Sequence, residues 1–189
     1  MTLFKSLLST IAEYKVVVES PMKIGKMGMN QLEDNTENYA FTLQIKQKIS
    51  DSQIDTLGAY KVYSYNVGNV VYDLFIDGDY TIALFSYITE GNRMIERKVW
   101  QEGSQVGLCR KIIFDYYLKK FDEIISDGLH TEIGEKYWKK LVKDAVKNGY
   151  IVSLLISGQY QPIDLNMVDS YFSHSPTSQN IRFSIKHHE

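Results

Sequence analysis

The chain has 189 residues, of which 44% are hydrophobic and 23% are charged, and this balance fits one domain with a full core. A formal net charge of −2 gives no global footprint for nucleic acid, although a local basic face stays possible. The lone cysteine excludes an internal disulfide, no Cys/His cluster has zinc-ligand spacing, and no apolar run approaches the roughly 20 residues that span a bilayer. These features predict a single-domain cytoplasmic protein without a metal site or a membrane segment.

The first part of the chain changes character near residue 39. Residues 3–13 place apolar side chains at three- and four-residue spacing, which predicts an N-terminal helix. From Tyr39 the period changes to two, and apolar side chains alternate with polar ones over 41–46 and again over 61–65. We therefore expect strands from this point onward.

Two short turn sequences divide the next part of the chain. Asp77-Gly78 separates the apolar segment 70–76 from 80–87, which is typical of a tight hairpin. Glu90-Gly91-Asn92 then leads into another strand over 93–101. Three consecutive strands joined by such turns predict an antiparallel meander.

Beyond residue 101, helical and extended patterns alternate. Ser104 is a residue type that caps helix N-termini, and Gly149 is a natural C-terminal stop. Alternation at the end of the chain predicts a last, more exposed strand. The elements expected here are a helix over 106–119, a strand over 123–125, a helix over 131–148, and strands over 151–156 and 181–186.

The segment Gly103-Ser104-Gln105-Val106-Gly107 joins a strand to a helix. A glycine-bearing turn of this kind presents backbone N–H groups at the positive end of a helix, which suits a bound phosphate. The alternative interpretation is an ordinary loop into a core helix, because two glycines four residues apart are common.

This order of elements resembles the coenzyme A-binding half of the GNAT superfamily of N-acyltransferases, particularly divergent phage-encoded members. The resemblance covers residues 69–186, while residues 1–68 form a divergent N-terminal part. It implies one α/β (α+β) domain over 1–189, with a central, mostly antiparallel mixed sheet that is flanked by helices and splayed where the cofactor inserts. The helix over 3–13 is an extra element in this scheme.

The resemblance also implies a cofactor, acetyl-coenzyme A or another acyl-coenzyme A. The glycine turn would hold its pyrophosphate, strand backbone groups would pair with its pantetheine arm, and the start of the second helix would complete the site. The residues expected to bind it are Val99, Gln101, Gly103, Ser104, Gln105, Val106, Gly107 and Thr131.

The resemblance implies a general base on the strand that precedes the turn, and Glu96 lies there. The alternative for Glu96 is a surface charge paired with a neighbouring Lys or Arg. Asp127 follows a strand end, where functional groups collect, but it is equally a turn-forming residue before Gly128. Trp138 stands where the family often has a tyrosine acid, and Tyr137 is the nearest phenol for that role.

The leading hypothesis is an N-acyltransferase whose acceptor is an amine on a small molecule or a protein. Glu102, Gln105 and Trp138 depart from the usual family residues. These departures favour a rival in which the fold has lost catalysis and binds a host protein or another macromolecule. A nucleobase-modifying relative is a third possibility. The lysines of the 131–148 helix are expected to form a solvated face, or else to bind nucleic acid or the cofactor's 3′-phosphate.

Overall fold

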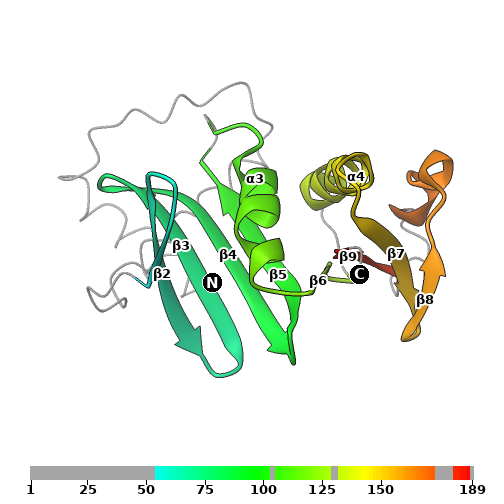
Figure 1. The fold of residues 1–189 in the computed structure, drawn as a ribbon, viewed down its shortest axis with the longest axis horizontal. Coiled ribbons are helices and arrows are strands. Elements are labelled where there is room, and N and C mark those ends of the chain that lie inside the picture. Colours follow the sequence, from blue (N-terminus) through cyan, green and yellow to red (C-terminus); the bar gives the residue numbers. More distant parts are fainter. Residues whose placement is uncertain (1–53, 103–104, 129–131, 173–180, 188–189) are drawn as a thin grey trace, which may run out of the picture. The chain divides into compact units, whose positions relative to one another are not determined.

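The computed structural model describes residues 54–102, 105–128, 132–172 and 181–187. The expected helix over 3–13 and the expected strand over 41–46 lie outside these residues, as do Gly103, Ser104 and Thr131. One mixed sheet organises the described part, with its strands in the order β1-β2-β3-β4-β5-β6-β9-β7-β8 (Figure 1). The strands are β1 (Asp55–Leu57), β2 (Tyr60–Val67), β3 (Val70–Asp77), β4 (Tyr80–Glu90), β5 (Arg93–Gln101), β6 (Glu123–Ile125), β7 (Ile151–Ile156), β8 (Gln159–Pro162) and β9 (Ile181–Lys186).

Strands β3, β4 and β5 form the expected antiparallel meander, and β1 and β2 extend it to five strands. Asp77 pairs with Tyr80, so Gly78 and Asp79 alone make the turn between β3 and β4. Gly78 has a φ of +56°, the left-handed conformation that the first position of such a tight turn requires. The hairpin prediction is therefore confirmed. The sequence could predict it because the residues of the turn itself specify this conformation.

The sheet becomes mixed where β6 pairs in parallel with β5. Strand β9 lies between β6 and β7 and is antiparallel to both. The expectation that 181–186 forms a more exposed strand is wrong, because Phe183, Ser184 and Ile185 are buried at the centre of this half of the sheet. Ser184 tolerates burial because its hydroxyl donates a hydrogen bond to Glu123.

Two helices pack on one face of the sheet, α3 (Leu108–Asp115) against β5 and α4 (Glu132–Lys147) against β7 and β9 (Figure 1). Ile112 and Leu141 belong to the same hydrophobic core as Phe75 and Phe85 from the sheet. Short 3-10 helices complete the described part: η1 (Tyr117–Lys119), η2 (Leu165–Met167) and η3 (Ser170–Phe172). None of the helices in the described ranges is long and apolar enough to cross a membrane.

The helix boundaries correct three details of the sequence analysis. Gly107, not Ser104, occupies the N-cap of α3, and it does so with a φ of +83°. Val106 precedes the helix and is 84% exposed, so it does not join the inner face. Ile133 is 48% exposed because it lies in the first turn of α4, outside the stripe that faces the sheet. Gly149 follows α4 at positive φ, as a C-terminal stop should.

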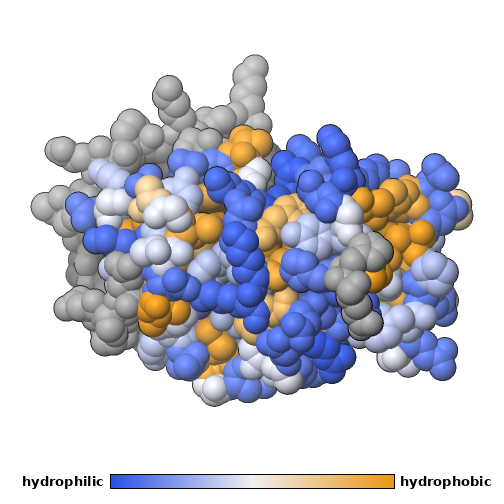
Figure 2. All heavy atoms as spheres, viewed as in Figure 1, coloured by the Kyte–Doolittle hydropathy of each residue, from blue (hydrophilic) through white to orange (hydrophobic). Residues whose placement is uncertain are grey.

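The outer side of α4 is a solvated face. Figure 2 shows mainly hydrophilic side chains over this helix. Lys139 lies within ion-pair distance of Asp169, at 3.1 Å. The exposed lysines of the helix are Lys136, Lys140, Lys143 and Lys147. This arrangement is what an amphipathic helix on a sheet requires.

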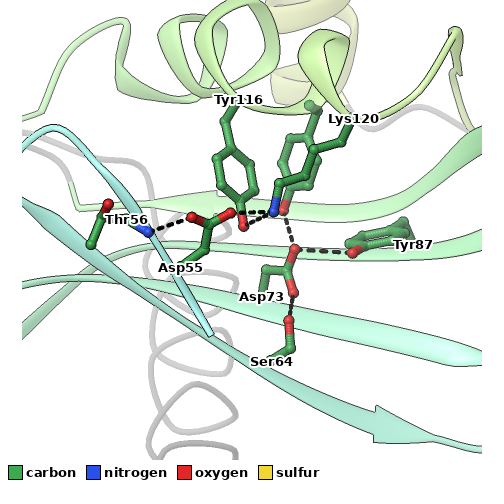
Figure 3. Close-up of polar contacts among 8 residues, drawn as sticks. Asp55, Thr56, Ser64, Asp73, Tyr87, Tyr116 and Lys120 are labelled. Carbon is green, nitrogen blue, oxygen red and sulfur yellow. Dashed lines mark hydrogen bonds and ion pairs between the residues drawn. The ribbon is translucent and has the colours of Figure 1, made fainter. Parts of the chain in front are cut away.

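A buried carboxylate ties the meander to η1. Asp73 on β3 accepts hydrogen bonds from Tyr87 Oη at 3.0 Å, from Tyr117 Oη at 2.9 Å, and from the Ser64 hydroxyl (Figure 3). Burial raises the pKa of Asp73, and the three hydroxyl donors partly offset that effect. The carboxylate thus fixes side chains from β2, β4 and η1 at one point.

A surface ion pair continues this network. Lys120 Nζ lies 2.5 Å from Asp55 Oδ2 and donates to Tyr116 Oη at 2.7 Å (Figure 3). The Lys120 ammonium also lies 3.9 Å from the centre of the Tyr116 ring. Strand β1, at the edge of the sheet, is thereby linked to the end of η1.

Candidate active site

Strands β5 and β6 run together for only three residues. Their pairing begins at Arg93 with Glu123 and stops at Ile95 with Ile125, where β6 ends. Strand β5 continues for six more residues to Gln101 while remaining paired with β4. The parallel pairing of β5 with β6 therefore ends at Ile95, and the expected splay of the sheet at this point stays a prediction.

A β-bulge lies directly beyond this point. Ser86 pairs with Lys98 and Tyr87 pairs with Glu96, so Arg97 is one extra residue on β5. A bulge re-aims the side chains on either side of it. Glu96 and Val99 consequently share the helix-covered face of the sheet, although they are three residues apart.

Glu96 is buried beneath α4. Its side chain is 5% exposed, and its Oε1 accepts a hydrogen bond from Trp138 Nε1 at 2.9 Å. Its Oε2 lies 3.4 Å from the Tyr137 hydroxyl. The alternative that Glu96 is a surface charge paired with a neighbouring base is wrong, because α4 covers this position of β5.

The pKa of Glu96 is raised to about 8. Burial is the main cause, since desolvation penalises the charged carboxylate. The hydrogen bonds from Trp138 and Tyr137 act in the opposite direction, whereas the negative charge of Asp127 raises the pKa further. A carboxyl group in this environment exchanges its proton near neutral pH, as a general base must.

Asp127 lies two residues after the end of β6, and its negative charge is the smallest of the influences on the pKa of Glu96. Its Oδ1 also accepts a hydrogen bond from the Gly128 N–H at 2.7 Å, so the turn-forming interpretation is correct as a local description. The structure thus brings together Glu96 and Tyr137, which the sequence analysis selected separately, while Asp127 acts on Glu96 only through its charge.

Ser126 holds the end of β6 in place. It is fully buried, its N–H donates to the Phe183 carbonyl at 2.8 Å, and its hydroxyl accepts from the Phe183 N–H at 2.9 Å. The hydroxyl also donates to the Asp127 carbonyl at 2.9 Å. Sequence reasoning missed this residue, because a serine before Asp-Gly looks like part of an exposed turn.

Trp138 is the second residue that sequence reasoning undervalued. Helical spacing predicts that Trp138 lies on the inner stripe of the 131–148 helix, and the residue is indeed only 1% exposed and stacks on Phe183 at 6.2 Å between ring centroids, but the pattern gives no sign of its contact with Glu96. Tyr137 is half-buried, and its ring meets the indole edge-on. Burial raises the pKa of Tyr137 well above its ordinary value, so the phenol stays protonated at neutral pH.

The turn before α3 makes several hydrogen bonds of its own. The Gln101 side chain accepts from the Cys109 N–H at 3.1 Å and so caps the first turn of the helix. The Gln105 N–H donates to the Glu102 carbonyl at 3.0 Å. Of the amides predicted to hold phosphate, that of Gln105 is therefore engaged within the turn, while Val106 lies at the surface and Gly107 at the helix start.

Cys109 lies on the inner face of α3. Burial, with a smaller contribution from the charge of Glu96, raises the pKa of this thiol well above its ordinary value. It is therefore a protonated core side chain and not an activated nucleophile. Within the described ranges, no group of His, Cys, Asp and Glu side chains could hold a metal ion.

Comparison with known proteins finds a distant structural similarity. No family model matches the sequence, and no curated protein matches it. The structure is similar to that of a Bacteroides thetaiotaomicron chain described as a GNAT-family acetyltransferase, with a TM-score of 0.37 and 9% identity over 100% of this chain and 85% of that one. By its own strand order, the described part of the chain has a mixed α/β fold with a large, mostly antiparallel sheet and two α-helices packed on it.

Proposed function

We propose that this protein is an N-acyltransferase that moves an acyl group, acetyl foremost, from coenzyme A to an amine. The observation that carries the proposal is the buried carboxyl of Glu96, directly after the point where β5 stops pairing with β6. An amine that enters as an ammonium ion must lose a proton before it attacks a thioester. A carboxyl with a pKa of about 8 is matched to that task.

The part of β5 beyond Ile95 fits the pantetheine arm of acyl-coenzyme A. Backbone groups of Val99 and Gln101 belong to this stretch, which continues after β6 has ended. Hydrogen bonding along a strand edge is a general way to bind an extended ligand. The amides of Val106 and Gly107 are the remaining candidates for the pyrophosphate, since that of Gln105 bonds to Glu102.

In this mechanism the bound cofactor supplies the thioester, and the chain moves the protons. Glu96 takes one proton from the acceptor ammonium: an N–H bond breaks and an O–H bond forms on the carboxylate. The amine then forms a C–N bond with the thioester carbonyl and the C–S bond breaks; Tyr137, which is protonated at neutral pH, donates its proton to the departing sulfur and takes up the second proton that the nitrogen loses. Cys109 takes no part, because direct attack by the amine needs no nucleophile from the enzyme.

The test follows thiol release from acetyl-coenzyme A with a panel of amines and peptides. Glu96→Gln is expected to lose turnover while it keeps cofactor affinity, because the amide has the same shape but cannot accept the proton. Affinity is measured by thermal unfolding, where a ligand at 100 times its dissociation constant adds about 2.7 kcal/mol. Glu132→Gln, an exposed position on α4, is the matched control.

The alternative function is a protein that keeps the fold and binds a host protein or another macromolecule. The engaged amide of Gln105 and the presence of Trp138 at the expected acid position favour it. Absence of both thiol release and stabilisation by acetyl-coenzyme A, together with a stable stoichiometric partner, would replace the first proposal with this one.

A further inference from the structure

The two carboxyl oxygens of Glu96 have different surroundings. Oε1 receives the indole N–H of Trp138 at 2.9 Å, which is an ordinary hydrogen-bond length. Oε2 is 3.4 Å from the hydroxyl of Tyr137, which is long for an O–H···O bond. One oxygen is therefore tightly held, and the other has only a weak partner.

The indole is fixed by aromatic packing on its far side. Trp138 stacks on Phe183, and Phe183 stacks on Phe172 with ring centroids 4.6 Å apart and planes 14° from parallel. An indole N–H donates a hydrogen bond but accepts none. Protonation of Oε1 would weaken its hydrogen bond from Trp138, because a protonated oxygen is a poorer acceptor, whereas Oε2 can take up a proton without that cost.

We propose that Trp138 is a positioning residue that holds Oε1 of Glu96, and that Oε2, with Tyr137 beside it, is the oxygen that exchanges the substrate proton. This inference rests on the proposed acyl transfer. The proton from the ammonium forms the O–H bond at Oε2. It leaves when Tyr137 accepts it and passes its own phenolic proton outward, which returns both groups to their starting state.

The surroundings are consistent with this division. The titratable groups facing the carboxyl are Tyr137 from α4, Asp127 after β6 and Cys109 from α3, and Arg110 acts on Tyr137. Tyr137 is less buried as a residue than Trp138, which is almost fully buried. A phenol hydroxyl can both donate and accept a hydrogen bond, whereas an indole N–H can only donate, so Tyr137 is the one of the two that can relay a proton.

The first experiment needs no activity. The chain has two tryptophans, so two indole N–H signals can be followed by NMR from about pH 6 to about pH 10. The Trp138 signal is expected to shift with pH, with a midpoint near the pKa of Glu96. In Glu96→Gln this pH-dependent shift is expected to be absent. Trp100, on the opposite face of the sheet, is the internal reference. If neither indole N–H signal changes with pH, or if the Trp138 signal still shifts in Glu96→Gln, the proposal that Trp138 holds Oε1 is wrong.

The second experiment uses the pH dependence of kcat/KM. Trp138→Phe removes a hydrogen bond that favours the charged carboxylate, so the acid limb is expected to move up by about one pH unit. Leu141→Ala, one turn further along α4 and also fully buried, is the control for lost packing and is expected to leave the limb in place. An acid limb unchanged in a folded Trp138→Phe would contradict the proposal.

The third experiment addresses the exchanging oxygen. Tyr137→Phe is expected to lower kcat several-fold and to make kcat rise with added imidazole buffer, which replaces the missing relay. Trp138→Phe is expected to show no such rescue. Wild-type kcat in Tyr137→Phe, or rescue in both variants, would overturn the role of Oε2. If no variant releases thiol, acyl transfer itself fails, whereas the NMR titration still decides whether Trp138 holds Glu96.

Discussion

The indole N–H of Trp138 donates a hydrogen bond to Glu96 across 2.9 Å, although 42 residues separate them in the chain. The bond joins α4 to the bulged part of β5, at the place where β6 ends. A carboxyl group buried there without a donor would be far more costly. The packing of α4 on the sheet and the chemistry of Glu96 are therefore one feature of the molecule.

Glu96 should make stability fall as pH rises. Its pKa of about 8 lies above the ordinary value of 4.5, so the folded state binds the proton more tightly than the unfolded state. Its contribution to the free energy of unfolding is fully present below about pH 4.5 and is lost by about pH 8. Each unit by which the pKa is raised corresponds to about 1.4 kcal/mol of this contribution. Urea unfolding of wild type and Glu96→Gln at several pH values measures this pH dependence. As pH rises, the free energy of unfolding is expected to fall less in the variant than in wild type. If the free energy of unfolding depended on pH equally in wild type and variant, Glu96 would not be a buried group that titrates in this range.

Asp73 should act in the same direction. Burial raises its pKa, so its contribution falls from about pH 4 upward until the folded pKa is passed. Tyr117→Phe removes one hydroxyl donor, which is expected to cost about 1–3 kcal/mol near neutral pH and to extend the decline to higher pH. Tyr80→Phe, at an exposed position of β4, is the control. Similar unfolding free energies for the two variants would argue against the network.

Gly107 tests the turn before α3. Gly107→Ala places a Cβ at a φ of +83°, 3.1 Å from Arg110 Nη2, and is expected to cost about 1–2 kcal/mol. Gly149→Ala is a matched control, because Gly149 has a φ of +82° with nothing within 4 Å of the added carbon. Both variants should lose stability, but only the change at Gly107 should weaken acetyl-coenzyme A binding. Equal affinity in both would remove this turn from the cofactor site.

Cys109 should be dispensable for chemistry. Its thiol is buried and protonated, so Cys109→Ala is expected to keep thiol release with a modest loss of stability from the missing sulfur. Loss of turnover in a folded Cys109→Ala, together with trapping of an acylated cysteine by mass spectrometry, would show a covalent route instead.

Local signals in the sequence determined much of the described fold. The turn glycines and the period of two gave the β3–β4 hairpin, and the bounds 93–101 and 123–125 agree with β5 and β6. These elements depend on contacts between near neighbours in the chain, which is why short patterns predict them. The same reasoning placed Glu96 on the right strand and Tyr137 on the right helix.

Only the tertiary structure decided what surrounds those residues. Burial of Glu96 depends on a bulge that pairs it with Tyr87 and on a helix that begins 36 residues later. The central place of β9 depends on pairing with β6 and β7, strands that are not its neighbours in the chain. The sequence therefore specified which groups the chain carries, and long-range packing set their partners, because desolvation and hydrogen bonding act between residues that only the fold brings together.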